Sequence, residues 1–260
     1  MSNEFIKYSV EGNVGKIIFN RPEKFNCFVR SMALQMIEAL DKASADKNVR
    51  AIYITGEGKA FHAGQDLSEA IDSSGPGIQK IVEEHYNPIV TKIRNAEKPV
   101  VCAVNGAAAG AGANIALACD VVIAASSAFF TQAFSKIGLI PDSGGTYFLP
   151  RLVGFGKASA LMMLAEKVSA ADAEKIGMIY KVVDDAKLQE EAFAIAKTLS
   201  EMPTRGIALT KKLLNESLSS TLAQQLDNEG RRQVEATRTY DFLEGVKAFI
   251  EKRKPVFRGE

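Results

Sequence analysis

Cysteine and histidine are both scarce in this sequence. Its 260 residues include only three cysteines, Cys27, Cys102 and Cys119, which are far apart and have no CxxC spacing. The two histidines, His62 and His85, stand alone. This pattern argues against a disulfide framework and against a typical zinc site. We therefore expect reduced thiols, a cytoplasmic location and no bound metal.

Surplus charge and long membrane-type segments are also lacking. The 32 basic and 31 acidic residues leave a net charge of +1, so we expect neither nucleic acid nor a membrane as a partner. The first ten residues include an early acid and lack the apolar core of a secretory signal. The uncharged run at residues 100–119 is rich in alanine and glycine and contains two asparagines, which favours a buried strand–turn–helix over a membrane span.

The pattern of apolar residues predicts an α/β fold with a helical C-terminal part. Alternating runs at 5–10 and 15–19 predict a hairpin. Further strands are expected at 51–55, 100–104 and 121–124, with helices at 31–45 and 78–95 between them. Strands that alternate with helices favour parallel pairing through right-handed crossovers. After residue 154 we expect a short strand near 182–183 and helices at 157–164, 170–176, 186–200, 204–218 and 221–238.

Two glycine-rich loops are candidates for binding an oxyanion through backbone N–H groups. The first, FHAGQDL at residues 61–67, follows a predicted strand, and its Asp66 can cap a helix. The second, NGAAAGAGAN at residues 105–114, also follows a strand and opens a helix, but it lacks the GxGxxG and GK[ST] spacings of nucleotide sites. Taken singly, the first loop is explained more simply as a tight turn with an N-cap, and the second as close packing of a helix on the sheet. If the loops follow neighbouring parallel strands, they converge at one edge of the sheet.

A third segment, GLIPDSGGT at residues 138–146, contains the candidate acid Asp142. An apolar pocket would raise the pKa of this carboxyl group into a range useful for proton transfer. The same residues also suit a type I turn, in which Asp142 is only conformational. The DSGG string resembles a serine protease motif, but neither histidine lies in the sequence context of a positioned base, so a serine hydrolase is rejected.

Together with FNRP at 19–22, Asn26 and AFIEKR at 248–253, these segments resemble the crotonase (enoyl-CoA hydratase/isomerase) superfamily over nearly the whole chain. The resemblance implies an α/β fold in which residues 1–195 form a crotonase-like spiral of ββα units and residues 196–260 form a C-terminal helical trimerisation region. It also implies an acyl-CoA substrate, no cofactor beyond the coenzyme A of that substrate, and a homo-oligomer that is a trimer or a dimer of trimers. The resemblance also suggests another crotonase-family subunit as a partner.

The resemblance assigns roles to individual residues. The thioester oxygen would be held by the backbone N–H groups of Gln65 and Ala111, and Asp142 would carry the proton. Substrate-binding candidates are Ala63, Gly64, Asp66, Leu67, Gly110, Phe134 and Leu139, and further candidates for the acyl pocket are Phe61, Ile71, His85, Tyr86 and Ile137. Coenzyme A contacts are expected from Lys24, Phe25, Phe249 and Lys252.

Two departures from the family pattern bear on the reaction. Hydratases of this family use two glutamates to handle water, and these positions are Asn114 and Phe134 here. A single remaining acid suits an isomerase, which moves one proton between two carbons of an enolate.

Residues 105–113, 133–142 and 177–185 look like the ring-1,2-epoxyphenylacetyl-CoA isomerases of phenylacetate catabolism. That subgroup opens 1,2-epoxyphenylacetyl-CoA to oxepin-CoA and can shift a 3,4 double bond to 2,3. The alternatives are a general Δ3,Δ2-enoyl-CoA isomerase of fatty-acid catabolism, a dehalogenase with Asp142 as nucleophile, and a non-catalytic CoA-binding subunit of a pathway complex.

Overall fold

The computed structural model describes residues 4–260, so the first three residues of the N-terminal segment discussed above lie outside the described part. A large sheet has the strand order β1 (Ile6–Glu11), β2 (Val14–Phe19), β3 (Ala51–Gly56), β5 (Val100–Val104), β7 (Val121–Ala125) and β10 (Lys181–Val183). β1 and β2 form the predicted antiparallel hairpin, and the other neighbours pair in parallel. The predictions of the hairpin and of parallel pairing are therefore confirmed.

A second, smaller sheet was not predicted. Its strands are β4 (Ala60–His62), β6 (Ala107–Ala109), β8 (Phe129–Thr131) and β9 (Lys167–Ser169), in that order. Along the chain, β3 and β4, β5 and β6, and β7 and β8 form successive pairs in which one strand joins the large sheet and the next joins the small one. Helical segments follow each pair, so the predicted spiral of ββα units is present.

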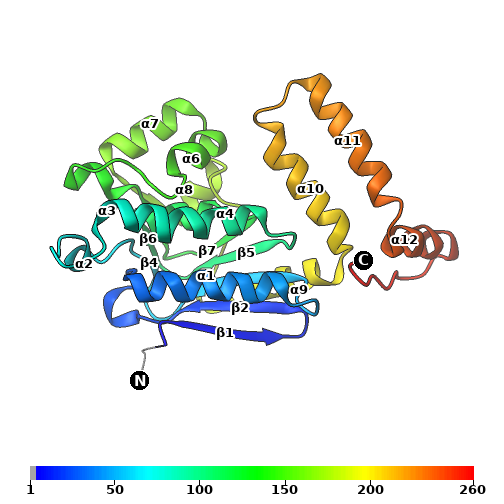
Figure 1. The fold of residues 1–260 in the computed structure, drawn as a ribbon, viewed down its shortest axis with the longest axis horizontal. Helices are drawn as coiled ribbons and strands as arrows, with labels where there is room; N and C mark the ends of the chain where they lie inside the picture. Colours follow the sequence, from blue (N-terminus) through cyan, green and yellow to red (C-terminus); the bar gives the residue numbers. More distant parts are fainter. Residues whose placement is uncertain (1–3) are drawn as a thin grey trace.

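The helices of the core surround these sheets (Figure 1). They are α1 (Arg30–Ala45), α2 (Leu67–Ala70), α3 (Gly77–Lys80), α4 (Asn87–Asn95), α5 (Ala111–Leu117), α6 (Gly145–Val153), α7 (Phe155–Leu164), α8 (Ala170–Lys175) and α9 (Leu188–Glu201). The single helix predicted over residues 78–95 is interrupted by a π-helix, Ile81–Tyr86, between α3 and α4. β3 and β5 are buried along their whole length, and α9 packs against both, because continuous apolar strands need cover on two faces.

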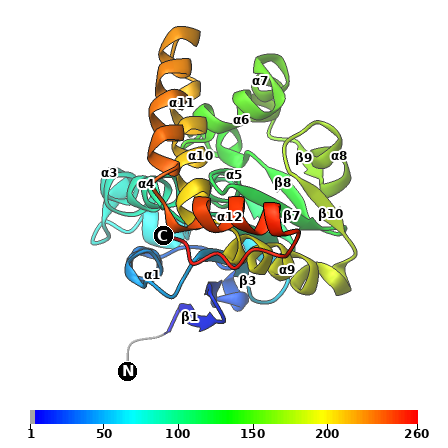
Figure 2. The same cartoon turned by 90° about the vertical axis from the view of Figure 1, so that its right-hand side faces the viewer.

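Three C-terminal helices extend away from the core: α10 (Thr204–Ser217), α11 (Leu222–Ala236) and α12 (Tyr240–Glu251) (Figures 1 and 2). The division expected after residue 195 falls inside α9, which covers the large sheet. None of the helices in residues 4–260 has the length and apolar character needed to cross a bilayer.

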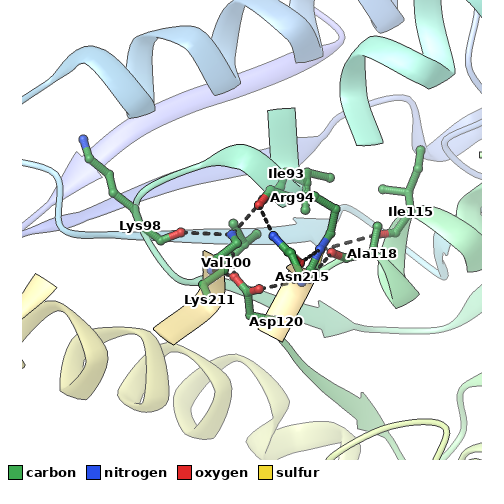
Figure 3. A network of polar contacts seen from close by, with 10 residues as sticks. Ile93, Arg94, Lys98, Val100, Ile115, Ala118, Asp120, Lys211 and Asn215 are labelled. Atoms are coloured by element: carbon green, nitrogen blue, oxygen red, sulfur yellow. Dashed lines mark hydrogen bonds and ion pairs between the residues drawn. The ribbon is translucent and has the colours of Figure 1, made fainter. Parts of the chain in front are cut away.

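A buried polar network fastens α10 to the core (Figure 3). Lys211 of α10 is only 6% exposed, and its ammonium group contacts Asp120 Oδ2 at 2.7 Å and the Ile93 carbonyl oxygen at 2.7 Å. Arg94 donates to Asp120 Oδ1 at 3.0 Å and also to Asn215 of α10. Burial lowers the pKa of Lys211, and the Asp120 carboxylate opposes this effect. Asp120 therefore compensates two cations at the junction between α10 and the sheet.

Replacement of Asp120 by alanine is expected to lower the free energy of unfolding by about 3 kcal/mol, because Lys211 and Arg94 would face each other with no anion between them. Urea denaturation measures this change. The control is Asp227→Ala, which breaks an exposed pair with Arg231 and should cost less than about 1 kcal/mol. Equal losses in the two variants would contradict a special role for the network.

Candidate active site

A cavity of about 500 Å³ lies between the two glycine-rich loops, the segment 78–86 and the segment that carries Asp142. Most of its lining is apolar, as expected for a small-molecule site with a few polar groups. The lining residues are Ala63, Gly64, Gln65, Leu67, Ala70, Ile78, Ile81, Val82, Tyr86, Gly110, Ala111, Ala133, Phe134, Lys136, Ile137, Leu139, Ile140, Pro141 and Asp142.

The first loop leaves the N–H group of Gln65 free. Gln65 forms a parallel β-bridge with Phe28, in which Phe28 N–H donates to the Gly64 carbonyl at 2.8 Å and Asp66 N–H donates to the Phe28 carbonyl at 2.8 Å. In a parallel bridge of this kind, the Gly64 carbonyl and the Asp66 N–H point toward Phe28, while the N–H of Gln65 itself points away from it. Within residues 4–260 the Gln65 N–H has no acceptor. It is available to a ligand in the cavity.

The second loop presents the N–H group of Ala111 to the same place. Gly110 has φ 55° and ψ −126°, a conformation that glycine adopts far more readily than other residues, and Ala111 then begins α5. The first N–H groups of a helix have no partner inside it, and that of Ala111 has no acceptor elsewhere in the described chain. A Cβ atom placed on Gly64 would lie 3.8 Å from the Ala111 nitrogen. The two loops thus meet, with two free donors between them.

The strands that deliver these loops differ from the expectation. Segment 105–114 follows β5 directly, as expected, but both segments also contain residues of short strands: β4 ends at His62 and β6 lies at Ala107–Ala109, and these two strands are parallel neighbours in the small sheet. The convergence has the predicted cause, since the carboxyl ends of neighbouring parallel strands lie at one edge. The strands responsible are short ones that the sequence pattern did not reveal.

Asp142 sits on a turn and also lines the cavity. Its carbonyl oxygen accepts from Gly145 N–H at 2.8 Å and from Asn114 Nδ2 at 2.9 Å, which fixes its backbone. The central residues, Ser143 and Gly144, have φ values of 52° and 74°, so the turn is left-handed and the predicted type I turn is wrong. Burial raises the pKa of Asp142 to about 6, although the Ser143 hydroxyl, which donates to Oδ1 at 2.8 Å, offsets part of this rise.

The two positions where hydratases carry glutamate cannot transfer a proton here. Asn114 is fully buried, and its amide is committed to the Asp142 carbonyl and to Gln132, whose Nε2 donates to Asn114 Oδ1 at 2.7 Å. The Phe134 ring lies against Gly110 and lines the cavity. Asn114 therefore positions the acid instead of acting as one.

Neither histidine is suited to carry a proton at neutral pH. His62 is fully buried, its Nδ1 accepts from Gly64 N–H at 3.1 Å, and burial lowers its pKa to about 3. His85 Nε2 lies 3.0 Å from Arg30 Nη1, which can only donate, so the ring is neutral. Burial and the Arg30 cation both lower the pKa of His85. His62 instead helps to shape the first loop.

Some expected site residues lie away from the cavity. Asp66 is the N-cap of α2 and pairs with Arg21 at 2.8 Å, so its carboxylate is used outside the cavity. Phe61 and His85 are buried in the protein, and Ile71 is 84% exposed, and none of the three lines the cavity. For Phe61 the reason is its place on β4, whose residues are all buried.

The coenzyme A candidates fall in two places. The Phe25 carbonyl accepts from Ala63 N–H at 3.1 Å, which places Lys24 and Phe25 beside the first loop. Phe249 and Lys252 belong to α12 and its C-cap, at the opposite end of the molecule from α2 and α3 (Figure 1). The chain does not bring these two pairs together by itself.

Several lining residues were not predicted, among them Ile78, Ile81, Val82 and Lys136. Ile78, Ile81 and Val82 have helical spacing, which is read as a face toward the protein core. Their approach to the first loop follows from tertiary contacts. No three His, Cys, Asp or Glu side chains of residues 4–260 are grouped so that they could hold a metal ion.

Comparisons with known proteins identify the family of this chain. The enoyl-CoA hydratase/isomerase family model matches residues 9–260. The chain is 46% identical over 260 residues to the 1,2-epoxyphenylacetyl-CoA isomerase of Escherichia coli K12, with 99% of each chain covered. It is 43% identical over 259 residues to a Rhodobacter capsulatus protein named "Probable enoyl-CoA hydratase", with 100% of each covered.

A crystal structure assigned to the enoyl-CoA hydratase/isomerases of Mycobacterium abscessus superimposes with a TM-score of 0.94 at 36% identity, covering 98% of this chain and 100% of the other. This match also confirms the predicted fold class. The chain therefore belongs to the enoyl-CoA hydratase/isomerase family, whose members in these comparisons carry both isomerase and hydratase names.

Proposed function

We propose that this protein is an acyl-CoA isomerase that works through an enolate, with Asp142 as its proton carrier. The observation that carries the proposal is the content of the cavity: Asp142 is the only carboxyl group in its lining among the described residues. A hydratase must activate and split water, whereas an isomerase needs one group that takes a proton and returns it. One half-buried acid beside two free backbone donors fits the second task.

The proposed reaction has two steps. The Asp142 carboxylate removes a proton from the carbon beside the thioester carbonyl, and the negative charge that develops on the carbonyl oxygen is held by the N–H groups of Gln65 and Ala111. Asp142 then returns the proton two carbons further along, which moves a 3,4 double bond to the 2,3 position. Each N–H donor would contribute roughly 3 kcal/mol to the stabilisation of the oxyanion.

For the substrate, we propose 1,2-epoxyphenylacetyl-CoA, which would be opened to oxepin-CoA. Removal of a proton beside the carbonyl gives the corresponding enolate, the carbon–carbon bond shared by the epoxide and the six-membered ring breaks, and the proton returns to a ring carbon, so that product and substrate are isomers. The name of the Escherichia coli relative and the apolar lining, which includes Ile137 and Leu139, support an acyl group with a six-membered carbon ring.

The second candidate is a Δ3,Δ2-enoyl-CoA isomerase for aliphatic chains, which the apolar cavity also suits. Turnover of trans-3-hexenoyl-CoA and of the epoxide under the same conditions separates the two. A higher kcat/KM for the epoxide is expected, and a preference for the aliphatic substrate would favour the second candidate. Release of halide from a halogenated aryl-CoA, with a covalent adduct on Asp142, would instead indicate a dehalogenase.

The activity is expected to fall at acid pH with a midpoint near 6. Asp142 must start as a carboxylate, and burial raises its pKa from 3.8 to about 6, so protonation stops the reaction as the pH falls through that value. The pH dependence of kcat/KM measures this pKa in the free enzyme. A midpoint near 4, or activity that rises toward acid pH, would contradict the role given to Asp142.

We also propose a homo-oligomer, a trimer or a dimer of trimers, built through the C-terminal helices. Exposed apolar side chains gather there, and patches of this kind commonly mark an interface; they include Leu222, Leu243, Phe249 and Ile250, which are between 63% and 86% exposed. In such an assembly, Phe249 and Lys252 would contact the coenzyme A held by a neighbouring subunit, and Lys24 and Phe25 that of their own.

A further inference from the structure

Tyr86 is a polar residue of the cavity that the proposed reaction does not use. Its side chain is fully buried and lines the cavity, and its hydroxyl donates to Gln65 Oε1 at 3.1 Å. A phenol has one hydrogen, so in this arrangement it has none left for a substrate. Burial, reinforced by the negative charge of Asp142, raises the pKa of Tyr86, which keeps the phenol protonated and able to donate.

The bond from Tyr86 is the first of a chain of hydrogen bonds that we call the Tyr86 relay: Tyr86, Gln65, Glu69 and the backbone N–H of Arg30. Gln65 Nε2 donates to Glu69 Oε2 at 2.9 Å. Both carboxylate oxygens of Glu69 accept from Arg30 N–H, at 2.9 and 3.0 Å, where α1 begins. A carboxylate is favourable at a helix N-terminus, so Glu69 is a firm anchor. The side-chain amide of Gln65 is therefore fixed through both its oxygen and its nitrogen.

Phe28 connects this chain with the backbone of the first loop. The backbone of Phe28 forms the β-bridge to Gln65, and its ring stacks on that of Tyr86, with centroids 6.0 Å apart and planes within 4°. Tyr86 is also the last residue of the π-helix Ile81–Tyr86, and π-helical turns are rare and concentrate at functional sites. Gln65 is thus held through its backbone by the bridge to Phe28 and through its side chain by hydrogen bonds to Tyr86 and Glu69.

We propose that Tyr86 is a positioning residue: acting through the Gln65 side chain, it fixes the direction of the Gln65 N–H toward the thioester oxygen. This inference rests on the proposed function, because it assigns that N–H to the oxyanion. The Tyr86 hydroxyl itself does not touch the substrate. Loss of the Tyr86 hydroxyl leaves the Gln65 N–H present but no longer fixes its direction. The stabilisation of the oxyanion should therefore weaken more than the binding of acyl-CoA.

The test compares Tyr86→Phe with Tyr53→Phe. Tyr53 also donates to a glutamine, Gln189 Oε1 at 2.7 Å, and is buried, but it does not line the cavity. Tyr86→Phe should lower kcat for trans-3-hexenoyl-CoA by about tenfold, a fraction of the loss caused by removing a donor. KM should stay within about twofold, because ground-state binding is largely kept. Tyr53→Phe should keep the wild-type kcat.

A second readout needs no turnover. Hexanoyl-CoA labelled with ¹³C at the carbonyl cannot isomerise, and the infrared frequency of its bound carbonyl falls as the two donors polarise it. Tyr86→Phe should show a smaller fall than wild type, and Tyr53→Phe the same fall. An unchanged carbonyl frequency and an unchanged kcat in Tyr86→Phe would overturn the inference and leave the role of Asp142 standing. An undiminished kcat in Asp142→Asn would overturn the proposed reaction. The carbonyl frequency would still test whether Tyr86 positions the Gln65 N–H, because it needs no turnover.

A double-mutant cycle separates positioning from direct contact. Gln65→Met removes the side-chain amide and keeps the backbone N–H. If Tyr86 acts through Gln65, the double variant should lose no more kcat than Gln65→Met alone. Losses that multiply would show that Tyr86 reaches the substrate independently and would overturn the inference.

Discussion

Replacement of Asp142 by asparagine is expected to lower kcat for trans-3-hexenoyl-CoA by about 10³-fold, the middle of the range for acid–base catalysis. Asparagine keeps the size of the side chain and can still accept from the Ser143 hydroxyl, but it cannot take a proton. No other carboxyl group of the described chain lines the cavity, and Asn114 and Phe134 cannot substitute. The absorbance of the conjugated 2-enoyl thioester gives the rate directly.

The fold and the binding of acyl-CoA should survive this change. The backbone of Asp142 is held through its carbonyl by Gly145 and Asn114, and these bonds do not depend on the carboxylate. Asp184→Asn, at an exposed site, serves as the control and should retain wild-type kcat. Wild-type turnover in Asp142→Asn would remove Asp142 as the proton carrier. Absence of turnover in the wild type, together with tight CoA binding, would indicate the non-catalytic subunit.

The substitution Gly64→Ala is expected to lower kcat by about 10²-fold, which is comparable to the loss of one oxyanion donor. Gly64 has a φ of 91°, where a side chain is strained, and a Cβ atom there would lie 3.2 Å from the Ala109 carbonyl oxygen of the second loop. The two loops must separate or twist to accept it. The N–H groups of Gln65 and Ala111 would then no longer meet at one oxygen.

Gly156→Ala is the matched control for this effect. Gly156 is the second residue of α7, and a Cβ atom added to it would meet no atom within 4 Å, so alanine should leave kcat unchanged and should not lower the stability. Thermal unfolding and kcat are measured for both variants. If Gly64→Ala keeps wild-type kcat, the gap between the two loops is not where the oxyanion forms.

The parts of the fold that could be predicted have a strong local pattern. β3, β5 and β7 are runs of apolar residues long enough to be recognised, and α1 and α10 have clear helical spacing. The strands of the small sheet are three residues long, and β6 consists only of alanine, a poor strand former. Their pairing is determined by the tertiary structure. The periodicity of the apolar residues therefore reveals the large sheet but not the small one, whose strands β4 and β6 lie just before Gln65 and Ala111.

The candidate site divides in the same way. Gln65, Ala111 and Asp142 lie in segments whose composition is unusual, and the structure brings all three to one cavity. The contacts that hold them are long-range and leave no local signal. Asn114 reaches Asp142 across 28 positions in the chain, and Tyr86 reaches Gln65 across 21. From the sequence, Asn114 is noticed only because hydratases have a glutamate at this position. In the structure, its side chain holds the backbone of Asp142.

Mass spectrometry of the products tests most directly whether a cavity with a single carboxyl group catalyses isomerisation and not hydration. The enzyme is incubated with trans-3-hexenoyl-CoA and, separately, with trans-2-hexenoyl-CoA. The thioesters are then separated by chromatography and their masses are measured. We predict a product of unchanged mass from the first substrate, the 2-enoyl isomer, and no product heavier by one water from either. Rapid formation of 3-hydroxyhexanoyl-CoA from the 2-enoyl substrate would contradict it, because a hydratase would then be operating without the two carboxylates that its chemistry requires.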